Sequence, residues 1–136
     1  MPIDYQIVHD QRLVIATPQG VLTDADLFGY QQEVWSRSDV KGYNELFDMT
    51  DVSHIEFIST QRLAFLADIS ARMDPPALTS KLAIIAIPDL HFGLGRVYEA
   101  YRETTQQSTK AVRVFRNRNE ALQWLGANIQ KNSQGI

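Results

Sequence analysis

The chain contains no cysteine among its 136 residues. That absence excludes disulfide bonds, thiolate metal sites, cysteine nucleophiles and thiol redox switches. The sequence also lacks an apolar run of the roughly 18 residues that a membrane-spanning helix requires. Its first residues, Met1 to Tyr5, have neither the basic nor the apolar region of a signal peptide. We therefore expect a cytoplasmic protein with no transmembrane segment.

Positive charge is scarce in the first part of the chain. Residues 1–80 carry 12 acids and 5 bases, residues 81–136 carry 4 acids and 8 bases, and the formal net charge is -3. The densest basic group consists of Lys110, Arg113, Arg116 and Arg118. Because the domain is acidic overall, these four residues alone would have to bind the phosphates of a nucleic acid. The sequence therefore predicts no nucleic-acid partner.

Motifs of the common hydrolases and metal enzymes are missing. The sequence has no Gly-x-Ser-x-Gly elbow, no His-Glu-x-x-His motif and no Gly-Lys-Ser/Thr phosphate loop. The histidines His9, His54 and His91 are too scattered to nominate a general base. We expect no catalytic residue, no metal and no cofactor, and hence a protein that is not an enzyme.

The apolar pattern predicts alternating strands and helices. Two β-prone runs around the polar pair Asp10-Gln11 indicate an antiparallel hairpin. The apolar run 81–87 suits a strand buried on both faces, as in parallel sheets covered by helices. The expected strands span residues 3–9, 12–17, 43–49, 81–87 and 111–115. The expected helices begin at residues able to cap, which are Thr23, Ser59 or Thr60, Asp89 and Asn117.

This order, ββαβαβαβα, predicts an α/β fold with a mixed sheet of about five strands and about four helices. Right-handed connections would make the strands after the N-terminal hairpin parallel, with helices on both faces of the sheet. No repeat or linker interrupts the pattern. We expect a single domain over residues 1–128 and a flexible tail over residues 129–136.

Polar residues gather where two of the predicted parallel strands end. They are Asp48 at the end of the third strand, Asp51, His54 and Glu56 after it, and Asp89 and His91 after the fourth strand. Ligands of open α/β sheets favour the crevice beyond these carboxyl ends. The group is therefore a candidate surface for a ligand or partner, or a candidate for metal binding or acid-base chemistry. The alternative is that these are ordinary turn and cap residues.

Two glycines and an arginine open the third predicted helix. In the stretch Phe92-Gly93-Leu94-Gly95-Arg96, exposed backbone amides and the guanidinium would suit an anion or small ligand. Close approach of the helix to a neighbouring element explains the glycines as well. Phe92 and the aromatic residues after it are either core or a strip for self-association or for a lipid tail.

Over most of its length the chain resembles the SpoIIAA-like proteins, which belong with the STAS and Sec14-like lipid-binding domains. The resemblance lies in residues 81–85, 92–100, 112–115 and 120–125, which are mainly core apolar positions. It implies a sheet of about five strands with helices on its faces. Family members of the anti-sigma factor antagonist branch bind a partner kinase, so the resemblance also implies function through protein binding.

The same resemblance implies a serine phosphorylated at the start of the helix after the third strand. If Asp48 and Val52 align with the family's residues, the switch serine falls on Phe57 or Ile58. Sliding by two residues offers Ser59 and Thr60 as phosphoacceptors, although the glycine that follows in the family is missing. The alternative is that Ser59 or Thr60 simply caps the helix.

Three functional hypotheses remain from the sequence. The first is a non-enzymatic module that binds a protein partner or a copy of itself as a homo-oligomer. The second, implied by the Sec14 kinship, is binding of a small apolar or lipid-like ligand between helices and sheet. The third is an enzyme that uses Asp48, Asp51, His54 or Glu56, which requires these side chains to converge in one concave pocket.

Overall fold

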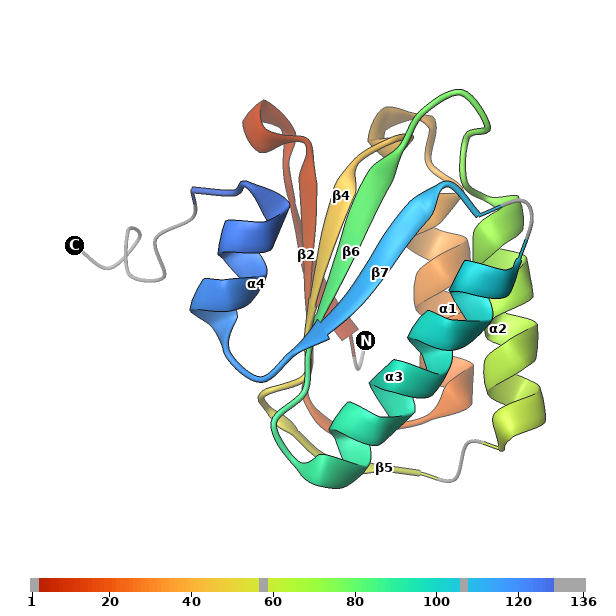
Figure 1. Ribbon diagram of the computed structural model, residues 1–136, viewed down its shortest axis with the longest axis vertical. Helices are drawn as coiled ribbons and strands as arrows, with labels where there is room; N and C mark the ends of the chain where they lie inside the picture. The colour runs from red at the N-terminus through yellow and green to blue at the C-terminus, as the bar shows by residue number, and fades with distance from the viewer. Residues whose placement is uncertain (1–2, 57–58, 106–107, 129–136) are drawn as a thin grey trace.

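The computed structural model describes residues 3–56, 59–105 and 108–128 (Figure 1). Its main sheet contains β1 (Ile3–Val8), β2 (Leu13–Pro18), β4 (Asn44–Asp48), β6 (Ser80–Ile85) and β7 (Lys110–Phe115), in the order β1-β2-β4-β6-β7. Strand β1 pairs with β2 antiparallel, and every later pairing in this sheet is parallel. The predicted hairpin followed by parallel strands is confirmed.

The helices cover the two faces of the sheet unequally. The helices α1 (Asp24–Trp35), α2 (Thr60–Arg72) and α3 (Asp89–Thr104) lie on one face, and α4 (Arg118–Leu125) lies on the other (Figure 1). The α/β fold class and the helices on both faces are therefore as predicted. None of the helices in the described part of the chain is both long and apolar enough to cross a bilayer.

Apolar side chains on both faces of the central strands explain why these residues form a buried sheet. On β4, Leu46 faces α4 and Phe47 faces the three-helix side, and both are buried. Strand β6 likewise alternates, because Ala83 and Ile85 pack under α4 while Leu82 and Ile84 pack under α1 to α3. Burial on two faces produces the continuous apolar run seen in the sequence.

Three helix starts agree with the predicted caps, which are Thr23, Ser59 and Asn117, and one does not. Thr23 forms a reciprocal capping box with Asp26 at α1, and Asn117 accepts a hydrogen bond from the backbone of Glu120 at α4. The prediction that Asp89 caps α3 is wrong. The N-cap is Pro88, which has no side-chain bond, and Asp89 is the first helical residue.

A small parallel sheet was not predicted. It consists of β3 (Gly20–Leu22) and β5 (Val52–Ile55), which lie outside the strands and helices expected from the sequence. Gly20 has a φ of +69°, which separates β3 from β2 although they follow each other closely. Leu22 and Val52 are buried, so this sheet closes the end of the core beyond the strands.

Short 3-10 helices at His9–Gln11 and Ser38–Val40 complete the described elements. At the first of them, the Gln11 side chain accepts a hydrogen bond from the backbone of Asn128 at 2.9 Å and donates one to its carbonyl at 3.4 Å. The end of the described chain is thereby fastened to the turn of the N-terminal hairpin. The tail predicted at residues 129–136 lies outside the described residues.

Candidate functional site

The sequence-predicted cluster lies at the end of the sheet where β5 and the start of α3 meet (Figure 1). Asp48 closes β4 and is mostly buried, with its carboxylate 2.9 Å from Nη1 of Arg118. It also accepts a hydrogen bond from the backbone N–H of Thr50 at 3.0 Å. Asp89 pairs with Arg116 at 2.7 Å on the surface. Asp48 and Asp89 therefore each stabilise a chain turn by pairing with an arginine from the segment around the start of α4.

The other acidic candidates and His54 are exposed. Asp51, His54 and Glu56 lie in or beside β5, with their side chains on the surface. None of these three lines either of the cavities described below. Within the described part of the chain, no three His, Asp or Glu side chains are grouped closely enough to hold a metal ion. Neither cavity therefore brings these three side chains together, as the enzyme hypothesis requires.

His91 is the buried member of the predicted cluster. It is only 5% exposed, and its Nδ1 has no hydrogen-bond partner among the described residues. Burial lowers the pKa of His91, and the charge on His54 lowers it further. Both effects favour the neutral form of this imidazole in the folded protein.

The two glycines of α3 have different surroundings. A Cβ on Gly95 would lie 3.1 Å from both γ-carbons of Val114 on β7, so this glycine allows the helix to approach the sheet closely. Gly93 has open space around it. Both lie inside the helix rather than in a loop before it. Arg96 is 62% exposed and pairs with Glu99 at 3.5 Å on the same helix.

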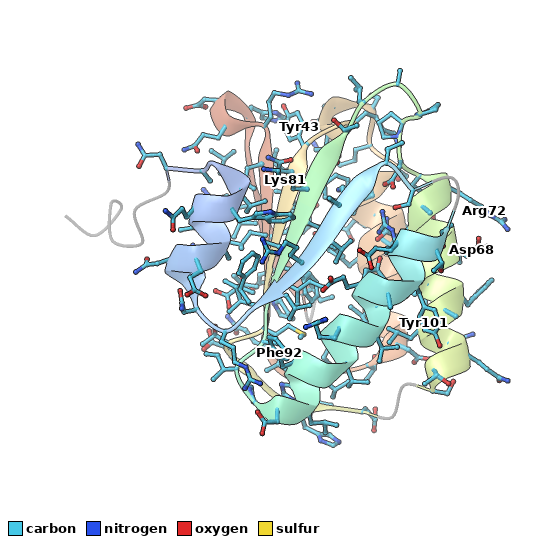
Figure 2. The ribbon with its side chains drawn as sticks, in the orientation of Figure 1. Tyr43, Asp68, Arg72, Lys81, Phe92 and Tyr101 are labelled. Atoms are coloured by element: carbon cyan, nitrogen blue, oxygen red, sulfur yellow. The ribbon has the colours of Figure 1, made fainter. Side chains whose placement is uncertain are left out.

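Phe92 lies near the start of α3, whereas Tyr101 lies near its other end (Figure 2). Phe92 is half-buried, and the guanidinium carbon of Arg116 lies 4.2 Å from its ring centre. This cation-π contact links the start of α3 to the segment after β7. Phe92 thus packs partly against the apolar core and partly under a charged side chain.

The predicted phosphoacceptors lie at the start of α2. Ser59 is the N-cap, and its hydroxyl accepts a hydrogen bond from the backbone N–H of Arg62 at 3.1 Å. Thr60 is the first helical residue and is exposed. The capping interpretation of Ser59 is confirmed, and a phosphoacceptor role stays a prediction. Phe57 and Ile58 lie outside the described residues.

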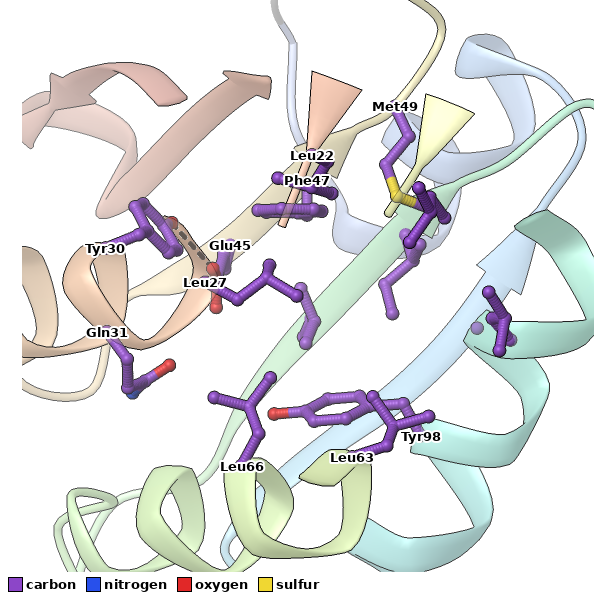
Figure 3. A pocket seen from close by; sticks show the side chains of 15 residues that line it. Leu22, Leu27, Tyr30, Gln31, Glu45, Phe47, Met49, Leu63, Leu66 and Tyr98 are labelled. Atoms are coloured by element: carbon purple, nitrogen blue, oxygen red, sulfur yellow. Dashed lines mark hydrogen bonds between the residues drawn. The ribbon is translucent and has the colours of Figure 1, made fainter. Parts of the chain in front are cut away.

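A cavity of about 90 Å³ lies between the sheet and the helices α1, α2 and α3 (Figure 3). Most of its lining is apolar, from Leu22, Leu27, Phe47, Met49, Ile55, Leu63, Leu66, Leu82, Ile84, Leu94 and Gly95. The lining residues Leu27, Gln31, Ile55 and Leu94 are only half-buried. The cavity therefore reaches the surface on their side.

A polar cluster lies at the inner end of this cavity. Tyr30 donates a hydrogen bond of 2.6 Å to Oε2 of Glu45 (Figure 3). Nε1 of Trp35 lies 3.3 Å from the same oxygen, and Nζ of Lys110 lies 3.6 Å from the other oxygen. The ammonium also lies 3.5 Å from the ring centre of Trp35. Glu45 is buried, and it therefore has two hydrogen-bond donors on one oxygen and the Lys110 ammonium as an ion-pair partner near the other.

Burial changes the acid-base behaviour of this cluster. It raises the pKa of Tyr30 well above its ordinary value, and the neighbouring Glu45 raises it further. Burial lowers the pKa of Lys110, an effect that the attraction of Glu45 partly offsets. Tyr30 is thus a neutral hydroxyl across the usual pH range, held in place by its acceptor.

A second buried cluster adjoins the first on the side of α3. Arg102 contacts the hydroxyl of Tyr98 through Nη1 at 2.8 Å and Asp74 through Nη2 at 2.7 Å. Asp74 also accepts from the backbone N–H of Thr109 at 3.0 Å. A cavity of about 10 Å³ lies between the clusters, with Glu45, Lys110 and Arg102 in its wall. Tyr98 is shared with the larger cavity.

Sequence reasoning did not nominate these clusters. The signal for Glu45 is an acid inside the apolar strand run from Tyr43 to Met49, where a charge needs a buried partner. Its partner Lys110 lies 65 positions away, at the start of another strand. Their pairing follows from the parallel alignment of β4, β6 and β7, which places the amino ends of the strands together.

Solved structures of other proteins have a similar fold. An uncharacterized protein of the DUF3478 family with a SpoIIAA-like fold, from Shewanella loihica PV-4, matches with a TM-score of 0.56 and 17% identity, over 90% of this chain and 91% of that chain. The murine anion transporter Solute Carrier 26 family member A9, in its inward-facing state, matches with a TM-score of 0.52 and 18% identity. That match covers 87% of this chain but only 18% of the transporter chain.

The anti-sigma factor antagonist SpoIIAA in its unphosphorylated form matches with a TM-score of 0.49 and 10% identity, over 93% of this chain and 99% of that chain. No protein-family model matches the sequence, and no curated protein does. The fold assignment rests on the strand order and on the first two structures. The chain has the SpoIIAA-like α/β fold that its sequence resemblance implied.

Proposed function

We propose that this protein is a non-enzymatic binding module whose ligand is a small, mostly apolar molecule held between the sheet and α1 to α3. The observation that supports this proposal is the apolar cavity of about 90 Å³. Protein interiors are packed to crystal-like density, and voids larger than a water molecule are few. An apolar void in a small domain costs stability, so a molecule that fills it is stabilised by the contacts that it restores.

The size of the cavity limits the part of the ligand that it can enclose. Water occupies about 30 Å³ per molecule in the liquid, and an engineered apolar cavity of about 150 Å³ holds benzene or xenon. The cavity described above is smaller, at about 90 Å³, so it can enclose a short alkyl chain or part of a ring. A longer molecule would extend through the opening beside Leu27 and Leu94.

Xenon is a suitable first probe because it needs only apolar volume. We expect xenon under pressure to shift the amide and methyl NMR signals of the lining residues in a saturable manner. Replacing Leu94 by Phe should fill the cavity and abolish these shifts. The matched control is Leu90→Phe, which makes the same change one turn earlier on α3 at a side chain that is 68% exposed.

Native mass spectrometry of the purified protein adds a second test, because a resident ligand would appear as an added mass that denaturation removes. Absence of saturable xenon shifts in the unmodified chain, together with a bare mass, would contradict the proposal. Equal shifts in the Leu94→Phe and Leu90→Phe variants would also contradict it, because the binding would then lie elsewhere.

The second candidate function is binding of a protein partner or of another copy of this chain. It is favoured by large apolar side chains that are exposed at the carboxyl end of the strands, namely Val21, Ile87 and Leu90. Sedimentation of the purified protein tests self-association. If dimers form, Leu90→Ser should weaken them; a monomer at all concentrations that captures no partner by crosslinking would count against this function. A cytoplasmic location remains a prediction.

A further inference from the structure

We infer that the cavity selects ligands carrying an uncharged hydrogen-bond donor, such as an alcohol or a phenol, over carboxylates of the same length. This inference rests on the proposed ligand-binding function and concerns the polar groups at the inner end of the cavity. Among the described residues that line it, the polar ones are Tyr30, Gln31, Glu45 and Tyr98.

Glu45 gives this end of the cavity an acceptor. The donors of Tyr30 and Trp35 meet on Oε2, while Oε1 faces Lys110 at the longer distance of 3.6 Å. A carboxylate has about four lone-pair positions on its two oxygens, so these contacts leave acceptor capacity for a ligand hydroxyl. A ligand carboxylate would instead meet the Glu45 oxygens as a second acceptor.

Lys110 does not reverse this preference, because it lies on the other side of Glu45. Its side chain lines the small cavity of about 10 Å³ and is absent from the lining of the large one. Arg102 is placed in the same way and is neutralised by Asp74 at 2.7 Å. An anion in the large cavity would therefore be buried without a free positive partner, which is costly.

The remaining polar groups are compatible with a donating ligand. Gln31 donates through Nε2 to the sulfur of Met73 at 3.4 Å, which directs its amide nitrogen toward that residue. Its amide oxygen is a further acceptor at the half-buried side of the cavity. Tyr98 accepts from Arg102 at 2.8 Å, so its hydroxyl is already engaged on one side.

A cationic ligand would satisfy Glu45 only at the expense of its existing partner. Lys110 already supplies one positive charge to this carboxylate, and both side chains are buried. A second ammonium would lose its hydration without a second counter-charge. The expected order of affinity is therefore alcohol first, with the ammonium and the carboxylate of equal chain length well behind it.

The test compares 1-pentanol, pentanoate and pentylammonium, titrated at neutral pH into the full chain and followed by NMR chemical shifts. We expect 1-pentanol to bind at least about tenfold more tightly than either charged probe. The variant Glu45→Gln should bring the affinities for pentanol and pentanoate within a few-fold of each other. If this variant does not fold because Lys110 loses its partner, Glu45→Gln/Lys110→Met removes both charges together and serves the same purpose.

The outcomes separate this inference from the function on which it rests. Saturable xenon binding with equal affinity for pentanol and pentanoate would overturn the inference and leave the cavity as a binding site. Tightest binding of pentylammonium would also overturn it, because the cluster would then select a cation. Failure of xenon and of all three pentyl compounds would remove the proposed function itself.

Discussion

The Nη2 atom of Arg102 lies 2.7 Å from Oδ2 of Asp74, and these side chains are only 3% and 8% exposed. Burial works against the charge of Arg102, but Tyr98 and Asp74 outweigh it and raise the pKa of the guanidinium. The pair joins α3 to the segment that follows α2. It therefore fixes the position of two of the helices that enclose the cavity.

Removing one partner of this pair should be strongly destabilising. We expect Arg102→Met to lower the free energy of unfolding by about 3 to 5 kcal/mol, because Asp74 is left buried without its counter-charge. Urea denaturation followed by circular dichroism measures the loss. The double variant Arg102→Met/Asp74→Asn should recover part of it, since no buried charge is then left unpaired.

The matched control on the same helix is Arg96→Met. Arg96 is 62% exposed and lies 3.5 Å from Glu99, so we expect a loss below about 1 kcal/mol. Similar losses for Arg102→Met and Arg96→Met would show that burial of the Asp74 pair contributes little to stability.

The glycines of α3 provide a second comparison. Gly93→Ala should raise the free energy of unfolding by about 0.5 to 1 kcal/mol, because alanine favours the helix and nothing obstructs its Cβ. Gly95→Ala should be less stable than Gly93→Ala by about 1 to 2 kcal/mol, because its Cβ meets Val114 at 3.1 Å. Thermal or urea unfolding checks both values.

Shortening the opposing side chain tests the cause. In the background Val114→Ala, the difference between the two alanine variants should shrink to a few tenths of a kcal/mol. An unchanged difference would place the cost of Gly95→Ala somewhere other than the contact between α3 and β7.

The neutral His91 should make stability dependent on pH. Its pKa is lowered in the folded state, so the unfolded chain binds a proton more readily, with an ordinary histidine pKa of about 6.5. The stability that depends on neutral His91 is therefore present above about pH 6.5 and is lost as the pH falls from there through the folded-state pKa. Urea midpoints measured between pH 4.5 and pH 8 follow this loss.

The variant His91→Asn removes the titration while keeping a polar side chain at the position. Its stability should fall less between pH 7 and pH 5 than that of the unmodified protein. A parallel decline in both proteins would assign the acid sensitivity to other groups.

The cap of α2 gives a fourth prediction. Ser59→Ala should lower the free energy of unfolding by about 1 kcal/mol, because the backbone N–H of Arg62 loses its acceptor. Ser59→Asp should retain most of this stability, since Asp is also a good cap, and Thr60→Ala should change it little. Equal effects of the alanine variants at Ser59 and Thr60 in urea unfolding would contradict the capping role.

The fold could be predicted from the sequence because its signals are local. The run from Leu82 to Ala86 indicates a strand buried on both faces, and Thr23 with Asp26 marks a helix start. The small sheet could not be predicted in the same way. Val21 and His54 pair across more than thirty residues, and neither flanking run is long enough to indicate a strand alone.

The candidate site was harder to predict because its residues come together only through the sheet. The strand-end residues Asp48 and Asp89 are conspicuous in the sequence, yet each is paired with an arginine that stabilises a turn. Glu45 and Lys110 show no local motif, and their pairing depends on strand alignment. An empty space between side chains has no signal in the sequence at all.

The hydrogen bonds between Gln11 and Asn128 have a practical consequence for studying the cavity. They fasten the described end of the chain on the α4 side of the sheet, whereas the cavity lies on the side of α1 to α3 (Figure 1). A fluorescent reporter or a surface tether attached after Asn128 therefore starts behind the sheet. Such an attachment leaves the ligand entrance facing the solution, which suits immobilised binding measurements.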